Sequence, residues 1–292
     1  MVSVVRMAAP DVVIRADAEV GEGPVWDERT AELAWVDITA GRFHRSRPAE
    51  GSDRVAGTGT LLGAVAPRRA GGWVAAVADG FAALGANGTL RLCACELPEP
   101  ERRMNDAKCD SQGRLWAGST TMAFAPGGGA LHRWDGGNRT RVLLSGLTLP
   151  NGLGWNPAGD TFYLVDSMAR RLYSFSFEAG DGSLGQRSLL IQFGASDGLP
   201  DGLCVDADGC LWIAFFGGGQ VRRYDPAGHQ LAVAPMPVSQ PSSCAFGPGG
   251  VLYITSARSG LTTGQLAAEP HAGSVFALDA NIDGAPVGTF AG

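Results

Sequence analysis

The chain has 292 residues, of which 45% are hydrophobic and 43 are glycine, and its formal net charge is −6. An acidic chain with scattered lysine and arginine is not expected to bind nucleic acid, and no run approaches the roughly 18 consecutive apolar residues of a membrane span. Residues 1–10 are too short and too weakly apolar for a signal peptide, so we expect a cytoplasmic protein without a nucleic-acid or membrane partner.

A short apolar run at residues 11–15 comes before a repeat that fills most of the chain. One phrase then recurs six times, with successive copies 40 to 50 residues apart. The copies begin at Glu22, Leu62, Asn105, Asn151, Asp201 and Ser242. A period of this size without a helical pattern is typical of the four-stranded blades of a β-propeller. The predicted fold class is therefore all-β, a six-bladed β-propeller in which residues 1–292 form a single domain.

Each phrase is followed by a turn and by a second run rich in aromatic and β-branched residues, which predicts a strand. Second strands are expected at residues 33–36, 73–77, 114–118, 161–165, 210–214 and 251–255. Third strands are expected at 131–134, 171–175, 220–224 and 274–278, and fourth strands at 141–144 and 188–191. The run at 11–15 either completes the last blade or is a frayed terminus. We expect the first, because closing the ring removes a free sheet edge.

Equivalent strands of successive blades converge on one axis, so the first residues of the phrase should meet at one end of a central channel. Glu22, Asn105, Asn151 and Asp201 occupy this position in four copies. Two carboxylates and two amides suggest a site for a hard cation. Taken singly, Asp201 and Asn151 could be turn residues before glycine, and Glu22 could be exposed. The shared register favours the ligand interpretation.

Two neighbouring positions leave alternatives open. Asn105 could bind the metal, a metal-bound water or the substrate. Asp106 follows it where the other copies mostly have glycine, and it either hydrogen-bonds the channel wall or takes part in function.

Other catalytic chemistry is poorly supported. The four histidines show no metal-binding spacing, and no serine lies in a Gly-x-Ser-x-Gly nucleophile elbow. Hydrolysis here would therefore rely on a metal ion. Four of the six cysteines are expected to be buried thiols in or beside strands, namely Cys109, Cys204, Cys210 and Cys244. Cys93 and Cys95 could instead form a redox or metal-binding pair.

Six motifs occur in the chain in a characteristic order. They are Gly21-Glu-Gly-Pro-Val-Trp, Trp35-Val-Asp-Ile, Arg103-Met-Asn-Asp-Ala-Lys-Cys-Asp, Leu149-Pro-Asn-Gly-Leu-Gly-Trp, Pro200-Asp-Gly-Leu-Cys-Val-Asp and Thr255-Ser-Ala-Arg. With them the chain resembles the gluconolactonase/regucalcin family of sugar lactonases, also called senescence-marker-protein-like, over nearly its whole length.

The resemblance implies a six-bladed propeller with one catalytic divalent ion, held by Glu22, Asn151 and Asp201. It also implies that Arg103 and Asn105 hold the hydroxyl groups of the substrate, and that the reaction is hydrolysis of a sugar-acid lactone. One departure concerns the stretch that follows the Asn-Asp motif. Several family members have an acidic residue there, whereas the stretch from Ala117 to Phe124 has none, so the identity of the sugar stays open.

We therefore expect hydrolysis of an aldonolactone, such as glucono-, xylono- or arabinonolactone, to the free aldonic acid. The ion would polarise the carbonyl group and lower the pKa of bound water, with Asp201 as the catalytic proton acceptor. Oxygen ligands suit Ca²⁺, Mg²⁺ or Mn²⁺, and Zn²⁺ and Fe²⁺ also accept such sites.

Two alternatives to this function stay open. One is a metal-dependent esterase or phosphotriesterase on the same scaffold, and the other is a non-enzymatic, calcium-binding regulatory propeller. The expected partner is a small-molecule sugar lactone, and the expected assembly is a monomer or a weak homo-oligomer.

Overall fold

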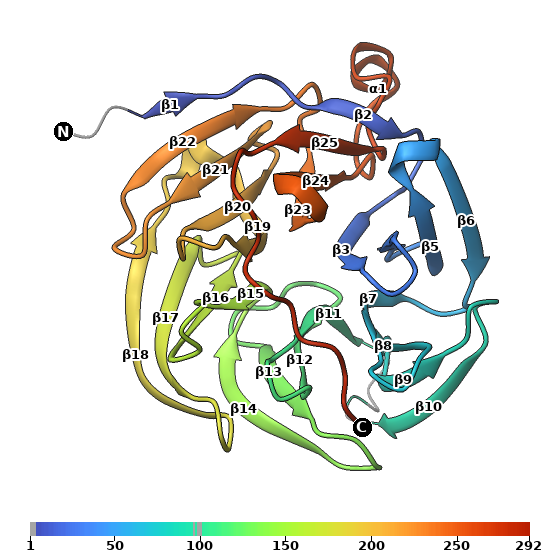
Figure 1. Cartoon of the computed structure of the whole chain (residues 1–292), viewed down its shortest axis with the longest axis vertical. Coiled ribbons are helices and arrows are strands. Elements are labelled where there is room, and N and C mark those ends of the chain that lie inside the picture. Colours follow the sequence, from blue (N-terminus) through green and yellow to red (C-terminus); the bar gives the residue numbers. More distant parts are fainter. Residues whose placement is uncertain (1–3, 96, 98–100) are drawn as a thin grey trace.

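The computed structural model describes residues 4–95, 97 and 101–292. Six sheets stand around a central channel, and each has its first strand beside the channel and its last strand at the outer rim (Figure 1). This arrangement confirms the all-β, six-bladed propeller that the repeat predicts.

The blades follow one another in chain order. The first contains β3 (Gly21–Asp27), β4 (Glu32–Asp37), β5 (Arg42–Arg47) and β6 (Ser52–Gly57), and the second contains β7 (Leu62–Pro67), β8 (Trp73–Val77), β9 (Gly80–Leu84) and β10 (Leu90–Cys95). The third contains β11 (Arg102–Cys109), β12 (Leu115–Thr121), β13 (Gly129–Trp134) and β14 (Thr140–Leu147). The fourth contains β15 (Pro150–Trp155), β16 (Thr161–Asp166), β17 (Arg171–Glu178) and β18 (Ser183–Gln192). The fifth contains β19 (Leu199–Val205), β20 (Leu211–Phe216), β21 (Gln220–Tyr224) and β22 (Gln230–Pro235).

The sixth blade is built from both ends of the chain, and this closes the ring. It contains β23 (Pro241–Phe246), β24 (Val251–Ser256), β25 (Val275–Asp279) and, as its outer strand, β2 (Asp11–Ile14). β2 pairs antiparallel with β25, which confirms the closure expected of residues 11–15. The still earlier β1 (Val5–Arg6) pairs parallel with β22 and adds a fifth strand to the fifth blade. The sequence did not predict β1, because two residues carry no periodic pattern.

Tryptophan side chains of the second strands are buried between the blades. Trp35, Trp116 and Trp212 are at most 1% exposed. The indole N–H of Trp116 donates to Asp110 Oδ2 (2.8 Å), and that of Trp212 donates to Asp206 Oδ2 (2.9 Å). Both aspartates also accept backbone N–H groups of the turns in which they lie. In the third and fifth blades, the turn that ends the phrase is thus tied directly to the core.

The C-terminal end of the chain crosses the channel (Figure 1). We call residues 283–290 the C-terminal strap. Its backbone N–H groups at Ala285 and Phe290 donate to Val205 O (2.9 Å) and Pro67 O (2.8 Å). Val205 and Pro67 are the last residues of β19 and β7, so the strap lies at the end of the channel where the inner strands finish.

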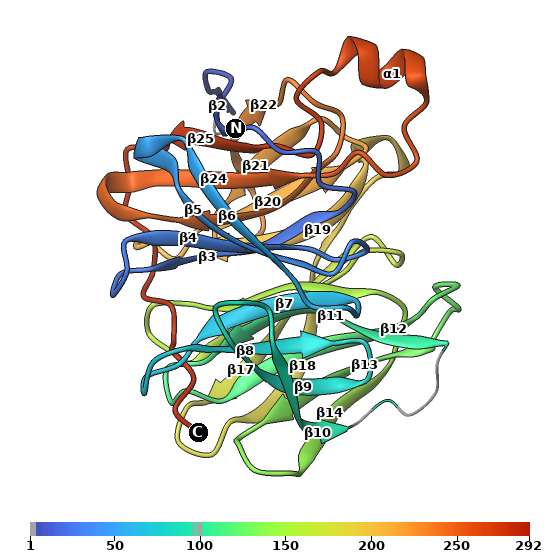
Figure 2. The ribbon, with the colours of Figure 1, turned by 90° about the vertical axis from the view of Figure 1, so that its right-hand side faces the viewer.

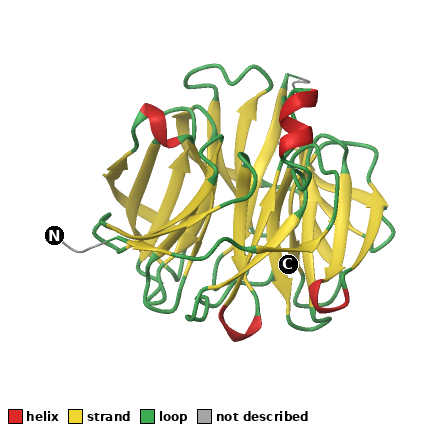
Figure 3. Ribbon diagram, turned by 90° about the horizontal axis from the view of Figure 1, so that it is seen from above, coloured by secondary structure: helices red, strands yellow, loops and turns green. Residues whose placement is uncertain are grey.

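Helices are short and lie at the edges of the sheets (Figures 2 and 3). The α-helix of the described residues is α1 (Thr263–Ala268), and 3-10 turns span Pro48–Glu50, Ala195–Asp197 and Pro248–Gly250. Within the described part of the chain, no helix has the length and apolar character needed to cross a membrane.

Candidate active site

The position shared by the repeats is a break in strand register. In all six blades the pairing of the inner strand with the second strand shifts at this point. A β-bulge of this kind re-aims side chains, and bulges are frequent beside active sites. The four predicted site residues at these bulges are Glu22 on β3, Asn105 on β11, Asn151 on β15 and Asp201 on β19. All four are buried.

The glycines after Asn151 and Asp201 are required by the approach of neighbouring inner strands. A Cβ atom on Gly152 would lie 2.6 Å from Asp201 O, and one on Gly202 would lie 2.7 Å from the Cα atom of Ser243. Asn151 and Asp201 therefore lie in packed strands, and the interpretation of either as a turn residue is wrong.

Asn151 and Asp201 contact each other across two neighbouring blades. Asn151 Nδ2 donates to Asp201 Oδ1 and to Ser167 Oγ, the latter over 3.1 Å. Asn151 Oδ1 is buried and has no hydrogen-bond partner in the described structure. A buried acceptor left unpaired costs about 1–3 kcal/mol. The site thus presents a buried, unpaired amide oxygen that is available to a ligand.

Glu22 adds a second carboxylate to this region. Its Oε2 accepts a hydrogen bond from Gly23 N over 2.7 Å. Burial, followed by the charges of Asp201 and Asp106, raises the pKa of Glu22 well above its ordinary value. Burial and the charge of Asp106 also raise the pKa of Asp201. The three acids are therefore close enough to repel one another in a region from which water is largely excluded.

Arg103 stands beside this acidic group and is held by Asn105. Its Nη1 donates to Asn105 Oδ1 (2.6 Å) and to Met104 O (3.1 Å). Asn105 Nδ2 donates in turn to Pro150 O on the next blade, over 3.1 Å. Burial lowers the pKa of the Arg103 guanidinium, and the charges of Glu22 and Asp201 oppose that shift. Asn105 thus fixes the direction of Arg103 and links the third blade to the fourth.

Two aspartates that the sequence analysis did not identify fix the backbone just before Asn151 and Glu22. Asp166, at the end of β16, accepts Thr148 N and Leu149 N, each over 3.0 Å. These donors lie three and two residues before Asn151.

Asp37, at the end of β4, does the same in the first blade. It accepts Glu19 N (2.9 Å) and Val20 N (3.1 Å), three and two residues before Glu22. Asp37 and Asp166 occupy the same place in their blades, and an Asp at the end of a second strand was the signal that could have identified them.

Asp106 and Lys108 follow the bulge on β11 and line the next part of the channel. Asp106 Oδ1 accepts Ala107 N over 2.8 Å, which is the wall contact that the sequence left open beside a functional role. Lys108 Nζ donates to Leu203 O over 2.8 Å and favours the charged form of Asp106, although burial raises the pKa of that carboxyl group.

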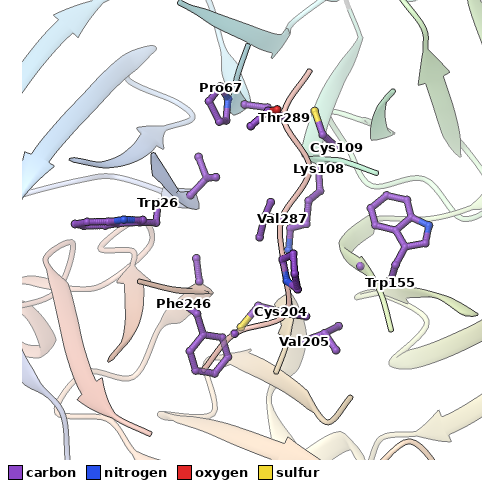
Figure 4. A pocket seen from close by; sticks show the side chains of 18 of the residues that line it. Trp26, Pro67, Lys108, Cys109, Trp155, Cys204, Val205, Phe246, Val287 and Thr289 are labelled. Carbon is purple, nitrogen blue, oxygen red and sulfur yellow. The ribbon is translucent and has the colours of Figure 1, made fainter. Parts of the chain in front are cut away.

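A cavity of about 980 Å³ occupies the other half of the channel (Figure 4). Asp106 and Lys108 line it, together with Trp26, Trp155 and residues of the C-terminal strap. None of the four predicted site residues lines this cavity. We therefore place the candidate chemistry at the bulges, where the buried acids gather, and not in this cavity.

The residues at the bulges fit a divalent cation. Glu22 and Asp201 offer carboxylate oxygens and Asn151 offers its unpaired amide oxygen, which are ligand types that hard cations prefer. Among the described residues, no group of three or more His, Cys, Asp or Glu side chains is placed to hold a metal ion, so a site here depends on the amide. The charge of an ion would also offset the repulsion between the acids.

Comparison with known proteins identifies the family. Residues 20–258 match the family described as SMP-30/Gluconolactonase/LRE-like region. The chain belongs to this family. The matched range contains all the predicted site residues, which confirms the gluconolactonase/regucalcin resemblance that the motifs indicate.

Full-length relatives support the membership in the SMP-30/gluconolactonase family. The chain is 37% identical over 285 residues to a 6-deoxy-6-sulfogluconolactonase of Pseudomonas putida, covering 96% of this chain and 98% of that protein. It is 34% identical over 289 residues to a regucalcin of Danio rerio, with coverages of 97% and 98%. The crystal structure of a calcium-binding protein, regucalcin, from Agrobacterium tumefaciens has a TM-score of 0.92 at 28% identity and covers 99% of both chains.

Proposed function

We propose that this protein hydrolyses a sugar-acid lactone to the free aldonic acid with the help of one divalent metal ion. The observation that carries the proposal is the unpaired, buried Oδ1 of Asn151 beside the carboxylate of Asp201. In a member of a gluconolactonase family, this arrangement is best explained as part of a cation site. Glu22, Asn151 and Asp201 would hold the ion.

When bound there, a divalent ion supplies a Lewis acid that stabilises negative charge on the carbonyl oxygen and makes water more acidic. The protein contributes the remaining steps. Asp201 accepts the proton of the attacking water, whose oxygen adds to the carbonyl carbon of the lactone. The bond between that carbon and the ring oxygen then breaks. The released alkoxide takes up a proton, and the product is an open-chain hydroxy acid.

Arg103 is proposed to hold the substrate. Asn105 and Met104 O engage only Nη1 of its guanidinium in the described structure. The remaining N–H groups have the fork geometry that suits vicinal hydroxyl groups. Asn105 supports that direction through its 2.6 Å contact and can offer one further N–H to the sugar.

The stretch from Ala117 to Phe124, in which several family members have an acidic residue, carries hydroxyl side chains instead. Thr120 Oγ1 donates to Thr148 O over 2.8 Å, and Ser119 Oγ lies 2.8 Å from His132 Nε2. Both hydroxyls are buried and engaged. We propose that this stretch lies beside the substrate without forming hydrogen bonds to it. The chain would then accept aldonolactones that differ at the distal carbon, a range that includes a sulfonated sugar lactone of the kind named for the Pseudomonas relative.

Metal reconstitution combined with a substrate panel tests the proposal. Protein purified without chelator is analysed for metal, stripped, and reloaded separately with Ca²⁺, Mg²⁺, Mn²⁺, Zn²⁺ or Fe²⁺. The panel compares gluconolactone, xylonolactone and arabinonolactone with an aryl ester and a phosphotriester. We expect the stripped protein to be inactive and at least one ion to restore lactone hydrolysis. Full activity of the stripped protein would refute metal dependence.

The same panel separates the alternatives. Faster turnover of the aryl ester or phosphotriester would favour an esterase or phosphotriesterase. A calcium-binding role is suggested by the Agrobacterium structure, which is described as a calcium-binding protein. Tight Ca²⁺ binding without turnover of any lactone would favour that role over the enzyme.

A further inference from the structure

Two thiols face each other between the fifth and sixth blades. Cys204 lies on β19 and Cys244 on β23, and their sulfur atoms are 3.5 Å apart. Both side chains are buried and both are free thiols. Cys244 Sγ donates to Trp212 O over 3.4 Å, so the hydrogen between the two sulfur atoms belongs to Cys204. The proposed hydrolysis uses neither thiol.

The backbones that carry the pair are close enough for a covalent bridge. The Cβ position of Gly202 on β19 lies 2.7 Å from the Cα atom of Ser243, the residue next to Cys244. A disulfide brings its sulfur atoms to about 2.0 Å, so the two sulfur atoms must approach by roughly 1.5 Å. We expect rotation of the two short side chains to supply this movement.

Cys204 is the member of the pair that a small oxidant meets first. It lines the channel cavity, whereas Cys244 is not among the lining residues (Figure 4). Burial and the contact with Cys244 raise the pKa of the Cys204 thiol, and the nearby Lys108 ammonium offsets only part of this shift. The reactivity of the pair therefore depends on the short distance between the two sulfur atoms and on the position of Cys204 at the cavity wall.

We propose that Cys204 and Cys244 form a redox-sensitive pair, which a peroxide converts into a disulfide that joins the fifth and sixth blades. The sulfur of Cys204 attacks one oxygen of hydrogen peroxide, the O–O bond breaks, and the leaving hydroxide takes the thiol proton and becomes water. The sulfur of Cys244 then attacks the resulting sulfenic sulfur. The S–S bond forms, the S–O bond breaks, and the second hydroxide leaves with the Cys244 proton as water. The two thiols lose two electrons, which one peroxide gains.

The bridge would change the behaviour of the whole ring. It connects residues 40 positions apart and restricts the unfolded chain by closing that loop. We expect it to raise the midpoint of thermal unfolding by roughly 5 °C. A dithiol reductant should reverse the change.

Peptide mapping of the whole chain tests the proposal. The protein is exposed to hydrogen peroxide, its remaining thiols are alkylated under denaturing conditions, and its peptides are analysed by mass spectrometry. We expect a linked pair of peptides that contain Cys204 and Cys244, two hydrogen atoms lighter than the separate peptides and separated by dithiothreitol. Cys109→Ser is the matched control because Cys109 lines the same cavity. This variant should keep the link, and Cys204→Ser should lose it.

Two results would overturn the proposal, and both can be read from the unmodified chain. One is full alkylation of Cys204 and Cys244 after a peroxide treatment that oxidises the less buried Cys93. The other is a peptide that links Cys204 to Cys109 in place of Cys244.

Discussion

Replacing Asp166 with asparagine should weaken metal binding while leaving the propeller folded. Asp166 accepts Thr148 N and Leu149 N through its two carboxylate oxygens, each over 3.0 Å. Asparagine keeps one acceptor and turns an NH₂ group toward the other backbone donor. Loss of one hydrogen bond, with a buried donor left unpaired, costs about 2 kcal/mol of unfolding free energy.

The effect on the site follows from the distance along the chain. Leu149 is two residues before Asn151, so a displaced backbone moves the amide oxygen that we assign to the ion. Loss of such a supporting contact typically weakens metal affinity by about 10- to 100-fold. We expect roughly tenfold weaker binding of the activating ion by Asp166→Asn. Isothermal titration calorimetry measures the affinity, and urea unfolding measures the stability.

Two further variants make this experiment decisive. Asp160→Asn changes an exposed acid in a turn of the same blade and should leave the metal affinity unchanged. Asp37→Asn removes the equivalent support ahead of Glu22 and should weaken binding as Asp166→Asn does. Asp166→Asn could lose stability as expected but bind the ion as tightly as the unmodified protein. The hydrogen bonds of Asp166 would then stabilise the fold alone, and our reasoning would be wrong.

Substitutions at four other residues test the remaining assignments. Asp201→Ala should abolish turnover and greatly weaken metal binding with an unchanged circular dichroism spectrum, and Glu22→Gln should do so less completely; normal metal content and activity in both would remove the proposed site. Arg103→Ala should lower kcat/KM for hydroxylated lactones by roughly 10- to 100-fold at unchanged metal content, with partial rescue by Arg103→Lys. An equal loss on a lactone without hydroxyl groups would show that Arg103 does not hold the hydroxyl groups of the substrate. Phe290→Ala should cost about 3–5 kcal/mol in urea unfolding, because this 1% exposed ring anchors the C-terminal strap; an unchanged midpoint would show that the strap does not stabilise the ring.

Much of the architecture could be predicted from local pattern. The repeated phrase predicts the inner strands because each blade meets the same environment at the axis. The run at residues 11–15 predicts closure because a propeller must pair its last open edge. Cys109, Cys204, Cys210 and Cys244 are buried as expected, whereas the side chain of Cys95 lies outside the described residues, so its pairing with Cys93 stays untested.

Other features had no local signal. β1 is two residues long and takes its place from the free edge of β22. The strap is an irregular segment whose position depends on where the ends of β7 and β19 lie. Asp37 and Asp166 are single acids in ordinary strand sequences. Only the fold shows from which backbone N–H groups they accept hydrogen bonds.

The sequence alone therefore determined that four oxygen-bearing residues share one position in a closed ring of blades, because a repeated pattern of burial and turns specifies a repeated unit. Only the tertiary structure decided how those residues meet. Bulges interrupt the pairing of the inner strands at these residues, and Gly152 and Gly202 allow neighbouring strands to pack closely. Asn151 then donates its N–H to Asp201 while its oxygen stays unpaired. Such contacts join residues about 50 positions apart, and their geometry depends on how one blade packs against the next, which no local stretch of the chain encodes.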